Sequence, residues 1–193
     1  NVWQSLGGME VGSVWGHGSY VAPDWSADWL HREAMFTLDH WANETFGREF
    51  TKLDAEQKAQ LVGRLTAQIR ANTYDPQTGA ITIDPVRAAA FDANLAHYSD
   101  VFANGQSDYA IPAGAVTDEA RLRQLAAFFF WTSWAAVTDR PGDKISYTHN
   151  WPYDPAAGNA PTPGILFWSV IGGLVLILSL GVVFFTYGKI DRD

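Results

Sequence analysis

Apolar residues recur at intervals of three and four positions in four segments of the chain, which predicts four amphipathic helices. The predicted helices cover residues 27–46, 54–71, about 85–98 and about 118–137. Helix-capping residues stand at their starts, namely Ser26, Asp54 with Gln57 in a capping box, Asp84 with Pro85, and Thr117. The pattern therefore predicts a mainly α domain.

The segments between these helices differ in what they predict. Residues 74–79 have turn chemistry, and 80–83 is expected to form a brief extended piece with them. Residues 99–116, which include Asn-Gly and Pro, are expected to be a loop. The segment 138–163 is rich in Pro, Gly and Asn. Because it is long for a structureless connection in a compact domain, we expect it to pack along a surface.

The C-terminal part of the chain has the properties of a transmembrane helix. The 23 residues from Ile165 to Tyr187 carry no charge and are numerous enough to span a lipid bilayer. Trp168 and Tyr187 stand where aromatic belts occur, and basic residues follow at Lys189 and Arg192. The positive-inside rule then predicts an extracytoplasmic domain, a transmembrane helix and a cytoplasmic end, with bounds 1–163, 164–188 and 189–193.

Composition excludes several kinds of chemistry. The 193 residues include no Cys, which excludes disulfides, thiolate metal sites, iron–sulfur clusters and covalently attached haem. The net charge of −8 argues against nucleic acid as a partner. The first residue is Asn rather than Met, as expected of a processed chain or of a segment of a longer polypeptide.

The histidines and carboxylates form no recognisable catalytic arrangement. His17 lies between two glycines and could be a ligand, a proton carrier or a loop residue. The last is favoured because no second ligand stands at helical spacing from it. His40 and Glu44 are four residues apart and are expected to form a solvated pair on a helix. The motifs GxSxG, HExxH and the P-loop are missing, so we expect no catalytic residue in this chain.

The run from Trp3 to Trp25 is unusually rich in both glycine and aromatic residues, and Pro23-Asp24 closes it. Its glycines permit positive φ angles and close approach, while its aromatic side chains supply packing area. Such a loop is expected to hold a ligand or to fit against another surface.

Three stretches of the sequence resemble one enzyme family. These are the segment GGMEVGSVWGHGSYVAPDWSADWLHRE after Trp3-Gln4, FFFWTSW at 128–134, and THNWPYDP at 148–155 before the membrane helix. Together they resemble the extracytoplasmic domain of quinol-dependent nitric oxide reductases, over essentially the whole chain. The resemblance implies that this chain is a segment of a larger enzyme.

The loop is also similar to the anchored subunit of cytochrome-c-type nitric oxide reductases, which carries the pattern W-Q-x-x-x-C-x-x-C-H-x-x-x-G-x-G-x-Y-x-A-P. Aligned from Trp3, this sequence has Gly8 and Val11 at the haem-attaching cysteines and Gly12 at the histidine iron ligand. The resemblance therefore implies a cytochrome-c-like helical domain without haem. It also implies that Gly18 and Tyr20 contact a calcium ion at the haem propionates of the catalytic region. The alternative is that these two residues merely pack on the membrane region.

The resemblance implies an activity that lies outside this segment. Two NO molecules are reduced to N2O and water by a quinol, at haem b, haem b3 and non-haem iron held by further transmembrane helices. The partners of this chain would be those helices, the membrane quinol and the lipid bilayer. The resemblance leaves open whether the protein forms a homodimer. The implied location is the bacterial cytoplasmic (inner) membrane, with residues 1–163 on the periplasmic or external face.

Two other hypotheses stay open. The chain could be a free-standing, membrane-anchored interaction subunit without catalytic residues that assembles with a separate catalytic chain resembling the haem-copper oxidases. A stop codon soon after Asp193 would favour this hypothesis. It could also be an anchored binding domain that uses the Gly/aromatic loop as a pocket for another ligand. That hypothesis predicts no haem-protein neighbour.

Overall fold

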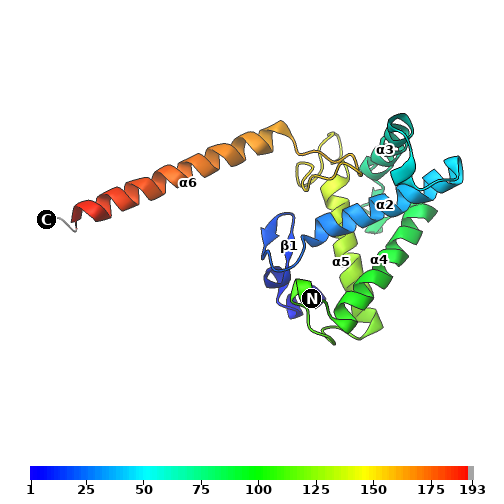
Figure 1. The fold of residues 1–193 in the computed structure, drawn as a ribbon, viewed down its shortest axis with the longest axis horizontal. Coiled ribbons are helices and arrows are strands. Elements are labelled where there is room, and N and C mark those ends of the chain that lie inside the picture. The colour runs from blue at the N-terminus through cyan, green and yellow to red at the C-terminus, as the bar shows by residue number, and fades with distance from the viewer. Residues whose placement is uncertain (191–193) are drawn as a thin grey trace. The chain divides into compact units, whose positions relative to one another are not determined.

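The computed structural model describes residues 1–190 and divides the chain into two compact units, one of residues 1–160 and one that begins at Pro161. Four long helices build the first unit (Figure 1). They are α2 (Trp25–Phe46), α3 (Ala55–Arg70), α4 (Pro85–Asn104) and α5 (Glu119–Val137). Helices α2, α4 and α5 pack against one another, and α3 packs against α2. The expected mainly α fold is confirmed.

Carboxylates cap the helices more often than the sequence pattern indicated. Asp54 and Gln57 form the predicted capping box of α3, and Asp84 caps α4 ahead of Pro85. The predicted caps Ser26 and Thr117 are wrong, because a nearby Asp caps the helix in both cases. Asp24 accepts a hydrogen bond from the Ala27 amide at 3.0 Å, and Asp118 accepts one from the Arg121 amide at 2.9 Å. An aspartate at the N-cap position also complements the helix dipole.

Helix α4 is longer than its sequence pattern predicted. It continues to Asn104, so the expected loop from 99 onwards begins only at Gly105, which has a φ of +83°. Tyr98, Val101 and Phe102 in this last part are buried in the core, and their burial stabilises the extra turns.

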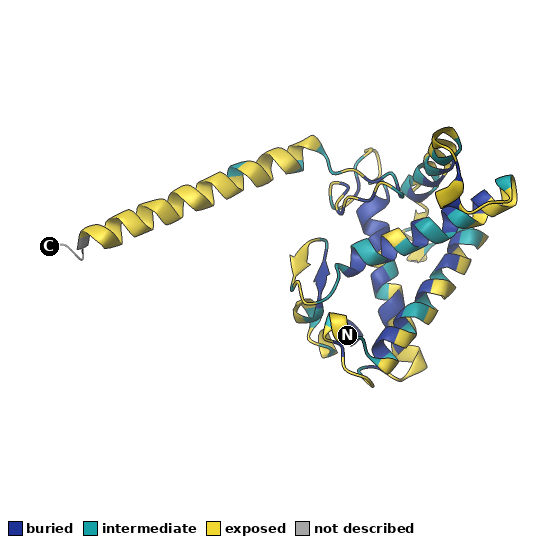
Figure 2. Ribbon diagram, viewed as in Figure 1, coloured by how far each residue is buried: buried dark blue, intermediate teal, exposed yellow. Residues whose placement is uncertain are grey.

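Two clusters of buried side chains form the core of the first unit. Figure 2 marks the buried residues of its helices in dark blue. The aromatic cluster has Trp25 stacked on Phe129, with centroids 5.0 Å apart, and Trp29 stacked on Tyr98 at 5.5 Å. The second cluster is mainly aliphatic and lies between α2 and α3. Its largest fully buried members are Leu30, Leu38, Trp41 and Leu65.

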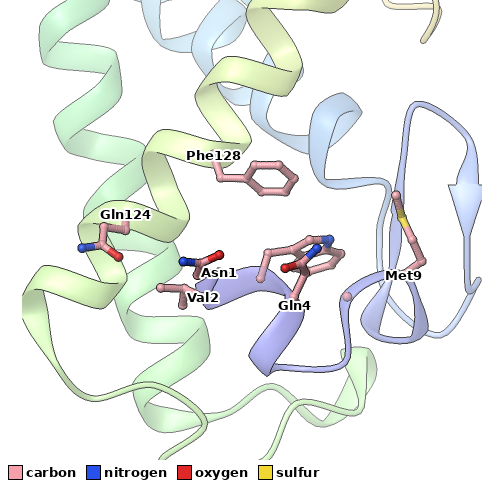
Figure 3. A pocket seen from close by; sticks show the side chains of 8 residues that line it. Asn1, Val2, Gln4, Met9, Gln124 and Phe128 are labelled. Atoms are coloured by element: carbon pink, nitrogen blue, oxygen red, sulfur yellow. The ribbon is translucent and has the colours of Figure 1, made fainter.

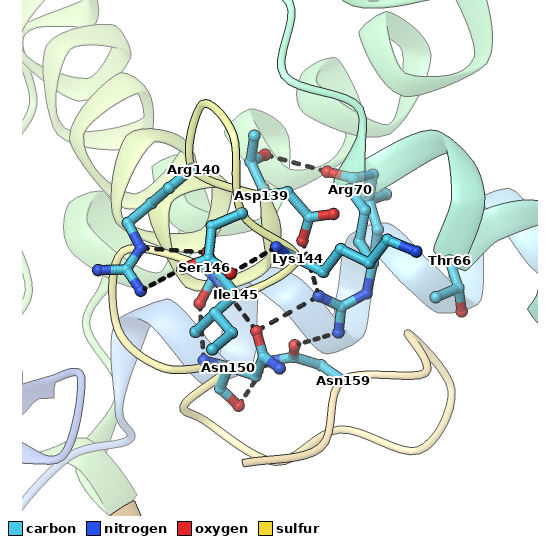
Figure 4. A network of polar contacts seen from close by, with 12 residues as sticks. Thr66, Arg70, Asp139, Arg140, Lys144, Ile145, Ser146, Asn150 and Asn159 are labelled. Atoms are coloured by element: carbon cyan, nitrogen blue, oxygen red, sulfur yellow. Dashed lines mark hydrogen bonds and ion pairs between the residues drawn. The ribbon is translucent and has the colours of Figure 1, made fainter. Parts of the chain in front are cut away.

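The connections carry little regular structure. Strands β3 (Tyr74–Asp75) and β4 (Ala80–Ile81) form the expected short antiparallel hairpin. The segment from 138 to 160 packs along α3 and the end of α5, as predicted from its length. Arg70 of α3 donates hydrogen bonds to Asp139, Asn150 and Asn159 of this segment at 3.1 to 3.3 Å (Figure 4).

Asn159 is the second centre of this polar network. Its side-chain amide donates to the carbonyls of Ala136, Asn150 and Pro152 at 3.3, 3.0 and 2.7 Å. Its backbone N–H and C=O both pair with Asp154. Because Asn159 is almost fully buried, these bonds satisfy carbonyl groups that would otherwise lack water as a partner.

The second unit contains helix α6 (Pro163–Ile190). The most apolar 18 residues within its stretch Pro163–Lys189 have a mean hydropathy of 2.5, and it is the one helix among the described residues that is long and apolar enough to cross a membrane. Lys189 lies in its last turn, whereas Arg192 lies outside the described residues.

Candidate functional site

Four short elements precede the first long helix and give the Gly/aromatic loop a defined shape. They are α1 (Val2–Ser5), the 3₁₀ helix η1 (Gly8–Val11), and the antiparallel strands β1 (Ser13–Val14) and β2 (His17–Gly18). The sequence predicted an irregular loop here and missed the helical turn at Trp3. That turn has only four residues, too few for a periodic pattern.

Asp24 holds the hairpin of this loop against helix α2. One carboxylate oxygen accepts hydrogen bonds from the Gly16 amide at 2.6 Å and from the Ser13 hydroxyl at 2.9 Å. The other oxygen caps α2 and accepts from the Ser26 hydroxyl. Ser26 in turn accepts from the Trp15 amide at 3.0 Å. Sequence reasoning treated Asp24 only as the end of the loop and so missed this role.

Gly12 allows the fully buried indole of Trp25 to lie directly on the loop backbone. Its φ is +128°, and a Cβ at this position would overlap the Trp25 ring and lie 2.8 Å from the Pro23 carbonyl oxygen. The Trp25 indole N–H donates to the Val11 carbonyl at 3.0 Å. No side chain of any kind therefore fits at position 12 in this packing.

These residues do not fit a covalently attached haem. The sequence has no cysteine to form the thioether bonds, and the position aligned with the histidine ligand is Gly12. The Trp25 ring packs where a side chain from position 12 would begin. The histidine nearest to Gly12 in the sequence is His17. It is exposed, and its Nδ1 lies 3.0 Å from the Trp15 carbonyl oxygen.

The two residues expected at a calcium ion lie at the exposed end of the hairpin. Gly18 has a φ of +137°, and a Cβ there would lie 2.8 Å from Ser13 Cα and 2.9 Å from the Met9 carbonyl oxygen. The Ser19 amide donates to that same carbonyl at 2.7 Å. The side chain of Tyr20 is 95 % exposed, so it does not pack on this unit. Residues 1–190 contain no group of three His, Asp, Glu or Cys side chains able to hold a metal ion.

The other histidines are dispersed. His31 pairs with Asp154 at 2.9 Å and so joins α2 to the segment before α6. His40 and Glu44 are both exposed, but no ion pair joins them, so the expected pair is wrong. His97 has a buried Nε2 with no hydrogen-bond partner among the described residues. Burial, and then the nearby Arg32 cation, lower the pKa of His97 below its ordinary value.

A buried ion pair lies in the core and was not predicted. Glu33 of α2 accepts a hydrogen bond from Arg87 of α4 at 2.6 Å and another from the Trp29 indole at 2.9 Å. Both charged side chains are almost fully buried. The signal available in the sequence was the position of Glu33 four residues after Trp29, on the apolar side of the helix. Its partner is 54 residues away and could not be inferred from spacing.

A hollow of about 530 Å³ opens beside the loop (Figure 3). It is lined by residues of α1, η1 and α5, and none of the lining side chains is an acid or a base. They are Asn1, Val2, Trp3, Gln4, Gly8, Met9, Gln124 and Phe128. In the view of Figure 3, the amides of Asn1 and Gln4 lie beneath the ring of Phe128, and Met9 lies on the side opposite Gln124.

The fold and the loop together define a class of protein: a helical domain that lacks haem-attaching groups at its glycine-rich loop and is followed by a helix long and apolar enough to cross a membrane. Comparison with protein families agrees with this assignment. Residues 1–153 match the family of the NorB cytochrome c-like domain of nitric oxide reductase, and the chain belongs to this family. No curated protein matches the chain. The relation to nitric oxide reductases expected from the sequence is thereby confirmed at the level of the NorB family.

Proposed function

We propose that this chain is the cap and one transmembrane helix of a quinol-dependent nitric oxide reductase. The enzyme would convert two NO and one quinol to N2O, water and quinone, with haem b, haem b3 and non-haem iron on helices outside this segment. The observation that carries the proposal is the family match over residues 1–153 together with Gly8, Val11 and Gly12 at the haem-attachment positions.

The missing haem groups bear on how electrons reach the membrane core. A cap that cannot hold haem cannot pass electrons from a soluble donor inward to that core. A lipid-soluble quinol delivers two electrons and two protons from within the bilayer, so the reaction balances without a haem in the cap. The cap would then cover the membrane core. It would lie on the periplasmic or external face of the bacterial inner membrane, with Lys189 toward the cytoplasm.

The test uses the complete protein, expressed with the remaining membrane helices and purified with its haem b. We expect NO consumption that depends on added quinol and that reduced soluble cytochrome c does not support. A complete protein that binds haem b but consumes NO with cytochrome c and with no quinol would contradict the proposal.

We also propose that Gly18 and Tyr20 contact a calcium ion at the haem propionates of the catalytic region. The supporting observation is the exposed Tyr20 side chain at the end of a hairpin with tight backbone packing. A glycine carbonyl and a phenol are neutral oxygen donors, so the negative charge that calcium prefers would come from the propionates.

The calcium role is tested by Tyr20→Phe in the complete protein, with Tyr153→Phe as the matched control because Tyr153 is also exposed. We expect Tyr20→Phe to change the haem b absorption spectrum and to lower the bound calcium, and the control to change neither. Unchanged spectra and unchanged calcium content in Tyr20→Phe would remove the calcium role and leave the proposed reaction untouched.

A further inference from the structure

The first unit carries exposed Trp and Tyr side chains around a second hollow, of about 370 Å³, at the end of α5. Tyr74, Trp131 and Tyr147 line this hollow and are each 43 to 45 % exposed. The ring of Tyr147 is stacked on the buried Trp134, with centroids 5.6 Å apart. None of the side chains that line the hollow is charged. We call Tyr74, Trp131, Tyr147 and the 37 % exposed Trp151 the aromatic surface.

The aromatic surface continues onto the Gly/aromatic loop. Trp131 packs against Trp15 with ring centroids 5.6 Å apart, and the Trp15 indole N–H donates to a backbone carbonyl of α5 at 2.8 Å. Trp151 lies on the backbone of the next residue of the loop, because a Cβ at Gly16 would come within 2.8 Å of the Trp151 indole nitrogen. Side chains from distant segments of the sequence therefore form one surface.

The residue types of this surface suit the headgroup layer of a lipid bilayer. Trp and Tyr combine an apolar ring with a polar N–H or O–H, and for that reason they concentrate at the boundary between acyl chains and water. The net charge of −8 gives the chain no general electrostatic attraction to anionic lipids. A contact with lipid therefore requires an uncharged surface, and the lining of this hollow has no carboxylate to oppose it.

The polypeptide itself limits how far the aromatic surface can lie from a bilayer. Asn159 belongs to the folded unit, and its side chain donates to the carbonyls of Asn150 and Pro152, on either side of Trp151. The apolar helix α6 begins at Pro163, four residues later, and four extended residues span no more than about 14 Å. Where α6 crosses a membrane, Trp151 is thus tethered near the headgroup layer. A soluble partner protein has no such tether, so lipid is the favoured occupant.

We infer that the aromatic surface rests on the headgroup layer of a phospholipid bilayer, with the rings of Trp131 and Trp151 at the level of the glycerol and ester groups. Indole N–H and phenol O–H groups there donate to ester and phosphate oxygens, while the ring faces cover acyl carbons. The inference rests on α6 crossing a membrane, as in the proposed function, but on no part of the NO chemistry.

The experiment places a nitroxide spin label on the 193-residue chain, reconstituted in vesicles of phosphatidylcholine and phosphatidylglycerol. Because the sequence has no Cys, each introduced Cys is a unique labelling site. Trp131→Cys and Tyr74→Cys report the aromatic surface from α5 and from β3. Glu44→Cys, at an exposed position in the last turn of α2, is the control outside this surface. Leu176→Cys, near the middle of α6, calibrates the signal of lipid.

Electron paramagnetic resonance measures the access of each label to oxygen, which concentrates in lipid, and to a nickel chelate, which stays in water. We expect the ratio of oxygen access to nickel access at positions 131 and 74 to exceed the ratio at position 44 several-fold. Adding Tyr147→Glu to the Trp131→Cys chain should lower its ratio toward that of the control, because a carboxylate is unfavourable in lipid and repels anionic headgroups. Gln60→Glu makes the same charge change at an exposed position of α3 and should leave the ratio unchanged.

Four results would overturn the inference. Labels at 131 and 74 could reach the nickel chelate as easily as the Glu44 control, or Tyr147→Glu could leave the ratio unchanged. In the complete protein, low access of both reagents to positions 131 and 74 would mean that other membrane helices cover the aromatic surface instead of lipid. A water-exposed label at position 176 would contradict membrane insertion of α6, and the inference with it.

The proposed reaction fails or holds on a separate measurement. A complete protein whose labels show the lipid signal but which consumes NO with no quinol would contradict the proposed function alone. Quinol-dependent NO consumption in a complete protein whose aromatic surface is open to water would overturn only the lipid contact.

Discussion

Replacing Gly12 by alanine tests whether the loop is built around the Trp25 ring. The added Cβ would overlap the indole, and the backbone at φ +128° and ψ −177° is unfavourable for any residue other than glycine. The backbone strain costs roughly 1–3 kcal/mol, the overpacking a similar amount, and the lost bond from Trp25 to Val11 about 1 kcal/mol. We expect Gly12→Ala to lower the free energy of unfolding by about 3 to 7 kcal/mol, against a usual total of about 5–15 kcal/mol.

The measurement is chemical denaturation followed by near-UV circular dichroism, because the stacked aromatic rings of the core lose their fixed packing when the first unit unfolds. Gly47→Ala is the matched control. Gly47 also has a positive φ, +64°, but a Cβ there meets no atom within 4 Å. It should therefore lose only the backbone term, about 1 kcal/mol.

The difference in stability between the two alanine variants is decisive. If Gly12→Ala destabilises the unit by no more than Gly47→Ala, then Trp25 does not constrain position 12. In that case the packing of Trp25 would also no longer explain why a histidine ligand cannot fit at position 12. A shared loss near 1 kcal/mol would leave only the backbone strain common to both glycines.

Three further predictions concern groups that the fold buries. Glu33→Ala leaves the buried Arg87 cation uncompensated and should lower the free energy of unfolding by about 3–5 kcal/mol, measured by chemical denaturation. A decrease below about 1 kcal/mol would contradict the buried ion pair. Asn159→Ala leaves three carbonyls without donors and should cost about 2–4 kcal/mol, with increased proteolysis of the 138–160 segment as a second measurement. The pKa of His97 is lowered in the folded chain, so the unfolded chain binds a proton at this residue more readily. The contribution of neutral His97 to stability is therefore fully present above about pH 6.5, and it is lost as the pH drops through the lowered pKa. His97→Gln should flatten this acid-side slope, and an unchanged slope would refute the assignment.

Local sequence patterns were sufficient for most of the fold. The periodicity of apolar residues predicted all four long helices, and the capping box at Asp54 fixed the start of α3. The errors in the helix starts lie where two capping residues stand close together. Asp24 and Asp118 occupy the N-cap positions instead of Ser26 and Thr117. In each case the carboxylate accepts a hydrogen bond from the backbone amide three residues further along the chain.

The candidate site depends on contacts that spacing alone does not predict. The overlap of Trp25 with Gly12, and the pairing of Glu33 with Arg87, join positions whose proximity is set by helix packing. The missing haem groups at Gly8 and Gly12 could be read from the sequence once it was aligned with a related pattern. The ring that packs against Gly12 could be found only from the structure.

The side chain of Asn159 has a mechanical consequence. It lies four residues before the start of α6, and it is bonded at once to Arg70 and to three backbone carbonyls. A displacement of the backbone at this position would therefore disrupt contacts to α3, to the end of α5 and to the 138–160 segment at once, because all of them converge on one side chain.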